Sequence, residues 1–508
     1  MEGRVEVFRF DPELDEAPLY ETYEFPYQEG MTVLDVAFYI YEQLDGTFSF
    51  SYCCRNSHCG LCGAKINGRP GLMCREPATK ELKLEPLDHL NVVRDLLIDR
   101  EDYDHCKEGM RLFLDRVDKA EKIPEYIDPK EHMKFMVASR CVECYSCVSD
   151  CPVLEEMPHE FLGPATLVQL ARHTFDPRDQ LSREIIAYSG GLYNCTTCGR
   201  CDVVCPHNIS PVRNIELIRE RLVEKNLAPQ AVKELQKIVD ESKKAIQPSR
   251  GHSPYLEEKE ELNKTGPVGL FIGCNIDYDF RMKKIAEEAR LILEKTATEV
   301  VVPKEQVCCG TPLVEMGSTA KLRELVLENV KLFEGSGCKE VISLCGGCGS
   351  GMMKTWPEIF QEEKGEELPF EVRDFSQYFL ETELMEKLGP VKKKIAYHQA
   401  CSLHRGQGVE DEPQRILKAI PELVLIETTV DDNCCGGGGG LRLSNQDLSQ
   451  KILNRKIRGL KEKGIESLVT GCPTCIKQLR HGLIRNKIRK VKVEHLVSII
   501  AHALREEN

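Results

Sequence analysis

Ten cysteines in the C-terminal half of the chain recur in the same order at a near-constant distance. The first set is Cys274, Cys308, Cys309, Cys345 and Cys348, and the second is Cys401, Cys434, Cys435, Cys472 and Cys475. Equivalent members of the two sets are 126 or 127 residues apart. A repeat at a fixed period indicates a duplicated structural unit. We therefore expect two copies of one domain, at residues 266–390 and 391–508.

Each repeat has the pattern of an α/β domain. Short apolar runs end just before or at a cysteine, and amphipathic stretches follow them. The runs are VGLFIG, EVISL, KIAYHQ and SLVTG, and the expected helices are 281–294, 320–333, 414–419 and 449–463. The cysteines are thus expected at strand ends and helix starts. Ligands in open α/β sheets gather there, and helix N-termini favour thiolates.

Two other interpretations apply to the C-x2-C pairs in these sets. Taken alone, CPTC from Cys472 is typical of a thioredoxin-like redox pair, and CGGC from Cys345 could be half of a zinc site. Five thiolates are one too many for tetrahedral zinc. They suit an iron–sulfur cluster in which one thiolate bridges two irons.

The middle of the chain carries two runs of the form C-x2-C-x2-C-x3-C-P. This is the bacterial two-cluster ferredoxin spacing, in which the fourth cysteine of each run serves the other cluster. One 4Fe–4S cluster is therefore assigned to Cys141, Cys144, Cys147 and Cys205, and the other to Cys195, Cys198, Cys201 and Cys151. Zinc is the alternative. The surrounding residues 103–241 are helical in pattern, with helices expected at 133–138, 165–173, 183–189 and 211–224.

The N-terminal segment contains a fifth cysteine set with the spacing C-x4-C-x2-C-x11-C. Its members are Cys54, Cys59, Cys62 and Cys74. The spacing is typical of a plant-type 2Fe–2S cluster, with zinc as the alternative. Strands at 5–10 and 21–25, a helix at 32–44 and an Asn67-Gly68 hairpin turn predict a β-grasp domain over residues 1–102. Gly60 and Gly63 are expected to let backbone amides approach the inorganic sulfides.

Of the chain's 25 cysteines, three remain outside these sets. We interpret Cys53, Cys106 and Cys338 as unligated thiols. Residues 242–265 are polar, highly charged and contain proline, so they are expected to form a solvated linker.

Composition excludes several classes of function. The net charge of −14 argues against a nucleic-acid partner. The sequence has neither an apolar run of about 18 residues nor an N-terminal signal core, so we expect a cytoplasmic protein without a transmembrane helix. No flavin or nicotinamide fingerprint is present. The chain must therefore exchange electrons with another subunit.

Two resemblances refine this expectation. Residues 1–210 resemble the iron–sulfur subunits of succinate dehydrogenases and fumarate reductases. That family usually holds a 3Fe–4S cluster with one non-cysteine position, whereas both runs are complete here. Residues 266–508 resemble the CCG domains of the catalytic subunit of heterodisulfide reductases. This likeness implies that each set of five cysteines holds a non-cubane 4Fe–4S cluster.

The combination resembles the iron–sulfur subunit of thiol:fumarate reductases. It implies oxidation of the coenzyme M and coenzyme B thiols to their heterodisulfide. Electrons would pass through the two cubanes and the 2Fe–2S cluster to an FAD-containing flavoprotein that reduces fumarate to succinate. The alternative is an electron relay without its own substrate, either in a succinate- or glycolate-type dehydrogenase or in a bifurcating complex like that of heterodisulfide reductases.

Other residues near the second set are candidates for substrate handling. His398 and His404 flank Cys401 and could accept a thiol proton. Arg281, Arg405 and Arg442 follow ligand cysteines and could bind an anionic thiol. Cys435 is followed by five glycines, whereas Cys309 is followed by one. We expect the extra glycines to leave room for substrate between the repeats.

Overall fold

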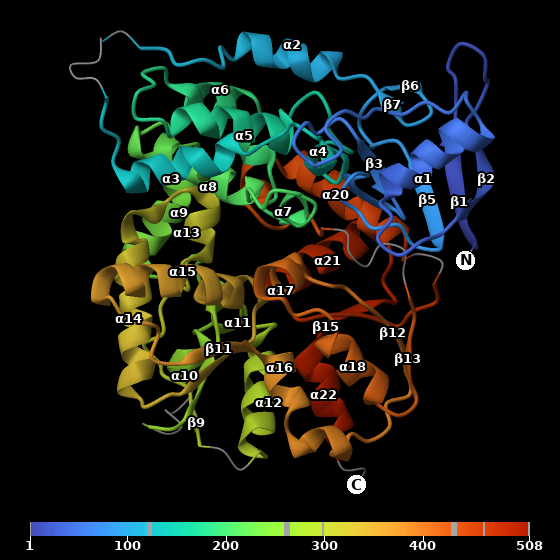
Figure 1. Cartoon of the computed structure of the whole chain (residues 1–508). Helices are drawn as coiled ribbons and strands as arrows, with labels where there is room; N and C mark the ends of the chain where they lie inside the picture. Colours follow the sequence, from blue (N-terminus) through green and yellow to red (C-terminus); the bar gives the residue numbers. More distant parts are fainter. Residues whose placement is uncertain are drawn as a thin grey trace. The chain divides into compact units, whose positions relative to one another are not determined.

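The computed structural model describes residues 2–116, 118, 124–258, 265–296, 299–427, 434–460 and 463–505. The chain forms two compact units. The first comprises residues 1–195 and 199–218, and the second comprises residues 196–198 and 219–508. Figure 1 shows both units, with labels on many of their helices and strands.

The first unit begins with a five-stranded sheet of order β2-β1-β5-β3-β4. Its strands are β1 (Glu2–Arg9), β2 (Leu19–Pro26), β3 (Gly63–Ile66), β4 (Arg69–Leu72) and β5 (Glu81–Glu85). The expected N-terminal strands and the Asn67-Gly68 turn are confirmed, since this dipeptide joins the antiparallel pair β3 and β4. Both turn residues have positive φ, as a tight hairpin turn requires. Strand β1 runs parallel to β5 and antiparallel to β2.

One helical segment packs on this sheet. Thr32 caps α1 (Val33–Tyr39) in a capping box with Asp35, which explains why the helix starts there. The expected helix over residues 32–44 is present, but its last turn, Ile40–Leu44, is a π-helix. Val33, Val36, Ala37 and Ile40 are fully buried against Val5, Val7 and Leu84 of the sheet. This core holds the cysteine-rich loop that follows.

The remainder of the first unit is helical apart from a small hairpin. The hairpin is β6 (Val92–Arg94) and β7 (Leu97–Ile98). The helices are α2 (Glu101–Gly109), α3 (Pro129–Ser139), α4 (Ser146–Ser149), α5 (Gly163–Thr174), α6 (Arg183–Ser189), the 3-10 turn Leu192–Asn194, α7 (Arg200–Val203) and α8 (Pro211–Glu224). The four helices expected in this region are confirmed, and α6 and α8 have the predicted bounds.

The second unit contains two similar modules preceded by α9 (Gln230–Ser242) and α10 (Tyr255–Glu258). The N-terminal module comprises β8 (Val268–Phe271), α11 (Cys274–Tyr278), α12 (Lys283–Glu294), β9 (Val300–Val301), α13 (Thr311–Met316), the 3-10 turn Thr319–Lys321, α14 (Leu322–Gly335), β10 (Glu340–Ser343), α15 (Gly346–Lys364), β11 (Glu371–Asp374), α16 (Phe375–Leu380) and the 3-10 turn Glu383–Lys387. The C-terminal module comprises β12 (Lys393–Tyr397), α17 (Cys401–Gln407), α18 (Glu412–Ala419), β13 (Leu423–Leu425), α19 (Leu441–Ser444), α20 (Gln446–Arg458), β14 (Ser467–Thr470), α21 (Pro473–Arg485), β15 (Lys492–His495) and α22 (Leu496–Ala503).

The two modules have the same topology. Their parallel sheets have the orders β11-β10-β8-β9 and β13-β12-β14-β15, and the second, reversed, matches the first strand for strand. The central strands β8 and β14 are buried throughout, as expected for parallel sheets covered by helices. The predicted duplication is confirmed by this topology.

The modules pack against each other with approximate two-fold equivalence. Helix α15 contacts α17, and the equivalent helices α21 and α11 are also in contact. The same reciprocity relates α16 with α18 and α22 with α12. Elements near the cysteine sets therefore meet at the seam between the modules.

Residues 242–265 are less solvated than a linker would be. Lys244, Ala245, Tyr255 and Leu256 are buried, and Lys244 pairs with the buried Asp277 at 3.1 Å. Part of the segment lies outside the described residues. The described part packs on the N-terminal module because its apolar residues and one lysine find partners there.

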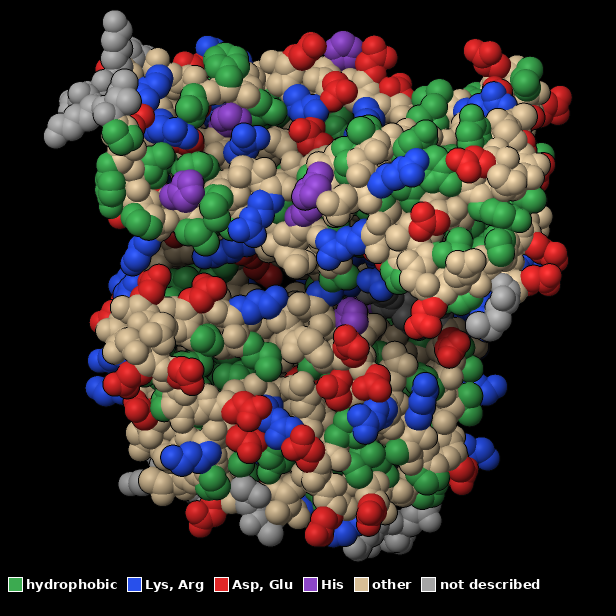
Figure 2. Space-filling model, in the orientation of Figure 1, with side chains coloured by type: hydrophobic (Ala, Val, Ile, Leu, Met, Phe, Trp, Pro, Cys, Tyr) green, Lys and Arg blue, Asp and Glu red, His purple; other side chains and the backbone are tan. Residues whose placement is uncertain are grey.

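The surface carries charges of both signs. Lysine and arginine side chains are interspersed with acidic ones on the face drawn in Figure 2. No helix in the described part of the chain is long and apolar enough to cross a membrane.

Candidate iron–sulfur cluster sites

The two sets of five cysteines occupy equivalent places in their modules. Cys274 and Cys401 are the first residues of α11 and α17. Cys345 and Cys472 cap α15 and α21 with nearly equal backbone angles. Nine of the ten cysteines are buried, and Cys401 is half-buried. The expectation that the cysteines lie at strand ends and helix starts is confirmed for the four named first, whereas the adjacent cysteines lie in loops.

The adjacent cysteines lie in matching loops. The amide of Gly310 donates to the Cys308 sulfur at 3.4 Å, and that of Gly436 donates to the Cys434 sulfur at 3.3 Å. Both glycines have positive φ, which lets the chain turn sharply after the cysteine pair. Backbone amides thus approach the sulfurs directly.

The second cysteine of each pair lies among other thiols of its set. Neighbouring thiols, Cys308 first and then Cys348, hold the pKa of Cys309 well below its usual value. Cys434 and then Cys475 do the same for the pKa of Cys435, whose sulfur is 3.4 Å from that of Cys475. A thiol with a lowered pKa is readily available as thiolate, the form that binds iron.

The two sets also meet each other. Interaction with the Cys345 thiol, followed by that with Cys475, holds the pKa of Cys472 well below its usual value. Cys345 and Cys472 are the first cysteines of the two C-x2-C motifs. Both are only 3% exposed. The seam between the modules therefore brings the two ligand sets together.

The two candidate histidines have different surroundings. His398 is 1% exposed, and neither of its ring nitrogens forms a hydrogen bond within the described residues. Its imidazole and the sulfurs of Cys435 and Cys475 have atoms all within 4.8 Å of one another. His404 is half-buried, and its Nδ1 lies 3.1 Å from Nε2 of Gln399. Of the two, only His398 is grouped with ligand sulfurs in the part of the chain that the structure describes.

The three candidate arginines differ in their partners. Arg281 forms an ion pair with Asp279 at 2.9 Å, and Arg405 donates from Nε to the carbonyl oxygen of Cys198 at 2.7 Å. Arg442 is exposed. Arg281 is thus already neutralised by a carboxylate, which weakens its candidacy as an anion site.

The glycine run after Cys435 is closely packed. A Cβ on Gly436 would lie 2.7 Å from the Ser449 carbonyl oxygen, and one on Gly438 would lie 2.6 Å from that of Thr196. A Cβ on Gly440 would lie 2.8 Å from the Met316 side chain. Gly436 is the glycine that both modules share, and at Gly438 and Gly440 the close contacts contradict the expectation that the extra glycines leave room for substrate. These glycines permit close packing of the loop instead.

The first unit brings together the four cysteines assigned to the first cubane. Cys141, Cys144, Cys147 and Cys205 line one small cavity. Cys205 comes from the second run, as the crossed ferredoxin pattern requires. Burial, reinforced by the neighbouring thiols, raises the pKa of Cys147 well above its usual value. Such thiols become thiolates only when a cation compensates the buried charge.

Both runs adopt the same local fold. Glu143 and Tyr145 have positive φ in the first, as do Thr197 and Gly199 in the second. One-turn helices α4 and α7 then follow. The cysteines assigned to the second cubane, Cys151, Cys195, Cys198 and Cys201, are all buried.

The 2Fe–2S loop is exposed on one side and packed on the other. The amide of Asn56 donates to the Cys54 sulfur at 3.4 Å and, as the largest influence, lowers the pKa of this thiol to about 7. The amide of Ser57 donates to the Cys74 sulfur at 3.2 Å. Cys62, the buried member, lies in the same apolar core as Cys144.

Gly60 and Gly63 lie where two cysteine-containing loops come into close contact. A Cβ on Gly60 would lie 2.2 Å from the Val142 carbonyl oxygen, and one on Gly63 would lie 2.8 Å from that of Cys144. The glycines therefore allow the 2Fe–2S loop to press against the loop of the first cubane. This contact joins two candidate clusters within one unit.

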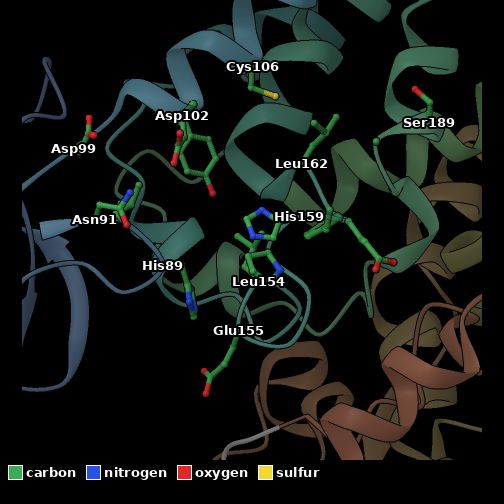
Figure 3. Close-up of a pocket in the computed structure, with 16 residues that line it drawn as sticks. His89, Asn91, Asp99, Asp102, Cys106, Leu154, Glu155, His159, Leu162 and Ser189 are labelled. Atoms are coloured by element: carbon green, nitrogen blue, oxygen red, sulfur yellow. The ribbon is translucent and has the colours of Figure 1, made fainter.

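A separate pocket of about 750 Å³ lies in the first unit. His89, Asp102, Cys106 and His159 are among the residues that surround it (Figure 3). Among the described residues that line it, no cysteine is assigned to a cluster.

The three cysteines outside the sets differ in burial. Cys106 is half-buried, Cys338 is buried and Cys53 is exposed. Burial raises the pKa of Cys338 to about 11, which suits an inert thiol.

The donor sets fit iron–sulfur clusters. They consist of clustered, mostly buried thiols that receive backbone amide hydrogen bonds. In the described part of the chain, His398 adds a buried imidazole without a hydrogen bond. Clustered sulfur donors that bind iron as thiolates are the ligands that iron–sulfur clusters require.

Sequence comparisons match these regions to known domains. A 2Fe-2S iron-sulfur cluster binding domain matches residues 4–105, and a 4Fe-4S dicluster domain matches residues 137–209. The CCG cysteine-rich domain matches twice, at residues 268–353 and 395–480. A subunit of the fumarate reductase (CoM/CoB) of Methanothermobacter marburgensis is 32% identical, over 99% of this chain and 99% of that protein. The chain belongs to this family of iron–sulfur oxidoreductase subunits.

Two further proteins resemble this chain over part of its length or in its fold. A subunit of the dihydromethanophenazine:CoB–CoM heterodisulfide reductase of Methanosarcina barkeri is 26% identical, over 73% of this chain and 95% of that protein. A hypothetical protein from Helicobacter pylori, known from its crystal structure, aligns with a TM-score of 0.64 and 17% identity, covering 100% of this chain and 95% of that one. The latter supports the fold alone. For this fumarate reductase family, the resemblance drawn from the cysteine pattern is confirmed.

Proposed function

We propose that this chain is the iron–sulfur subunit of a thiol:fumarate reductase. Its substrates would be the thiols of coenzyme M and coenzyme B, and its partner an FAD-containing flavoprotein that reduces fumarate to succinate. The observation that carries the proposal is the meeting of two complete five-cysteine sets at Cys345 and Cys472. Two adjacent sites suit a reaction that joins two sulfur atoms. The name of the relative from M. marburgensis supports the same activity.

The proposed cofactors follow the five cysteine sets. One 2Fe–2S cluster would be held by the set beginning at Cys54 in a β-grasp domain, residues 1–102. Two cubane 4Fe–4S clusters would be held by the crossed runs in a helical domain, residues 103–241. Two non-cubane 4Fe–4S clusters would be held in the CCG domains, residues 266–390 and 391–508, by the sets beginning at Cys274 and Cys401.

The reaction balances as two coupled halves. Two thiols lose two protons and two electrons as one S–S bond forms, and fumarate takes up two electrons and two protons to become succinate. When bound, the non-cubane clusters would supply two one-electron acceptors, so that no free thiyl radical is needed. The chain itself would hold the two sulfurs near the N-termini of α15 and α21, where the helix dipoles favour negative charge. His398 and His404 are the proposed acceptors of the two thiol protons.

The contact between the 2Fe–2S and cubane loops supports the proposed route of the electrons. Gly60 and Gly63 allow these loops to touch, so electrons that reach the first cubane would find the 2Fe–2S cluster beside it. The half-buried ligands Cys54, Cys59 and Cys74 leave one side of that cluster accessible to a flavoprotein.

The test uses the purified complex of this chain with its flavoprotein partner. With both thiols and fumarate present, we expect stoichiometric loss of the two thiols and formation of succinate. Replacement of Cys435 with serine should abolish this reaction. It should preserve fumarate reduction driven by reduced viologen, because viologen donates its electrons to the other clusters. Succinate formation that requires viologen and never responds to the thiols would refute the proposal and indicate a pure relay.

A further inference from the structure

The two modules differ at the position three residues before the first cysteine of each set. The N-terminal module has Phe271 there, and the C-terminal module has His398. Phe271 packs edge-to-face on Trp356, with ring centroids 5.9 Å apart, and tilted against Phe333 at 6.2 Å. This position in the N-terminal module is thus filled by an apolar aromatic cluster that offers no hydrogen bond.

His398 is a polar group in an equally buried position. A buried polar group without a partner destabilises the fold. In the described part of the chain, neither ring nitrogen has one. The sulfurs of Cys435 and Cys475 and a ring nitrogen of His398 all lie within 4.8 Å of one another. A histidine at this buried position indicates that its ring forms a hydrogen bond when the site holds its cluster.

A second difference between the two modules also concerns a buried polar residue near the cysteines. In the N-terminal module, Asn329 is fully buried and donates from Nδ2 to the carbonyl oxygen of Cys308 at 3.2 Å. The equivalent position, 16 residues before the C-x2-C motif, is Lys456 in the C-terminal module. Lys456 is 1% exposed, and its charge acts on His398. The C-terminal site therefore has a buried cation and an imidazole where the N-terminal site has an amide and a phenyl ring.

The His398 ring can act as the donor of such a bond. A ring nitrogen lies within 4.8 Å of the Cys435 and Cys475 sulfurs, and an imidazole carries at least one N–H group.

We propose that the His398 N–H donates a hydrogen bond to the Cys435 sulfur, and that this bond makes the C-terminal cluster easier to reduce than the N-terminal one. Hydrogen bonds to cluster sulfurs stabilise the more negative, reduced state and so raise the reduction potential. The two cluster sites would then be unequal, and the C-terminal one would take the first electron. This inference rests on the proposed cluster in the C-terminal module and adds a functional order to the two sites.

The test compares variants of the full chain in its complex by redox titration followed by electron paramagnetic resonance. His398→Phe gives the C-terminal module the residue of the N-terminal module, and Phe271→Leu is the matched control. We expect His398→Phe to keep its iron content and to disfavour reduction of one cluster about tenfold, which is about 59 mV for one electron. Phe271→Leu should leave that cluster unchanged, and His398→Gln, which retains an N–H donor, should restore most of the difference.

Three outcomes would overturn the inference. The first is an unchanged potential in His398→Phe at full iron content. The second is strong nitrogen hyperfine coupling in the wild type, which would indicate that the imidazole binds iron directly. If His398→Phe loses iron, His398→Gln is compared instead with His398→Asn, whose side chain is shorter. Equal reduction potentials of the cluster in these two variants would be the third such outcome. A wild-type C-terminal module that binds no iron would instead refute the proposed function itself.

Discussion

The side chains of Cys345 and Cys472 interact across the seam between the two modules. Each cysteine caps a helix of its own module, α15 or α21, and each belongs to a different ligand set. The duplicated fold thus does more than repeat a binding site. Its approximate two-fold packing places two equivalent sites side by side, as a reaction between two sulfur atoms requires.

Replacement of Cys205 with serine should damage the cluster of the other run. Cys205 lines the cavity of Cys141, Cys144 and Cys147, so the variant is expected to alter the signal of that cubane and to spare the one assigned to Cys195. Electron paramagnetic resonance and iron analysis of the purified chain would measure this. Cys338→Ser is the control, because this buried thiol belongs to no set and should leave the iron content unchanged. Loss confined to the cluster of Cys195 would contradict the crossed assignment.

Replacement of Gly60 with alanine should destabilise the first unit. The residue has a φ of 68°, and its new Cβ would lie 2.2 Å from the Val142 carbonyl oxygen. We expect a loss of at least about 2 kcal/mol, from left-handed backbone strain and from displacement of the cubane loop. Urea denaturation would measure it. Gly68→Ala shares the positive φ but meets nothing within 4 Å, so it should cost about 1 kcal/mol. Equal losses would show that the loop contact is unimportant.

Removal of the Arg183 side chain should destabilise the helical part of the first unit strongly. Arg183 is fully buried, pairs with Asp179 at 2.7 Å and donates to the carbonyl oxygens of Met110, Arg111 and Phe113. Arg183→Ala leaves Asp179 buried without this partner, which typically costs about 3–5 kcal/mol. Arg221→Ala, which breaks an exposed pair with Glu224, should cost at most about 1 kcal/mol. The thermal midpoints of the two variants would separate these cases, and similar midpoints would contradict the prediction.

The stability of the N-terminal module should depend on the protonation of Asp374. Burial raises the pKa of this carboxyl group to about 6. A carboxyl with a raised pKa stabilises the fold while it is protonated, and this contribution is lost as the pH rises from about 4 through about 6. Asp374→Asn stays neutral, so its stability relative to the wild type should increase over this range.

Urea midpoints between pH 4 and pH 7.5 would measure this effect. Asp128→Asn is the control, since Asp128 also caps a helix, α3, but is exposed. A stability difference for Asp374→Asn that does not change with pH would contradict the prediction. A difference that falls as the pH rises would also contradict it.

The sequence predicted the local features of the fold well. The helices at Arg183–Ser189 and Pro211–Glu224 have the expected bounds, since apolar spacing, together with Pro211 at the start of the second helix, marks them within one stretch of chain. The 4Fe-4S dicluster domain was also predictable, because its two cysteine runs are short and have a spacing typical of such domains.

Non-local packing could not be predicted in the same way. No local pattern shows that Gly60 lies against Val142, or that the glycine run after Cys435 is closely packed rather than open. The π-helical turn at Ile40–Leu44 and the packing of Tyr255 and Leu256 also depend on residues distant in the chain. The contrast between Phe271 and His398 is visible when the two repeats are aligned. The contrast can be interpreted only once the structure shows that both side chains are buried beside the ligand sets.

The burial of Cys345 and Cys472 at the seam has a consequence for biogenesis. Each is 3% exposed, so a protein that donates clusters cannot contact them while the two modules are packed together. The proposed clusters would therefore be inserted before the modules pack on each other. The contact that unites the two sites would thus set the order of maturation, with cluster insertion first and packing second.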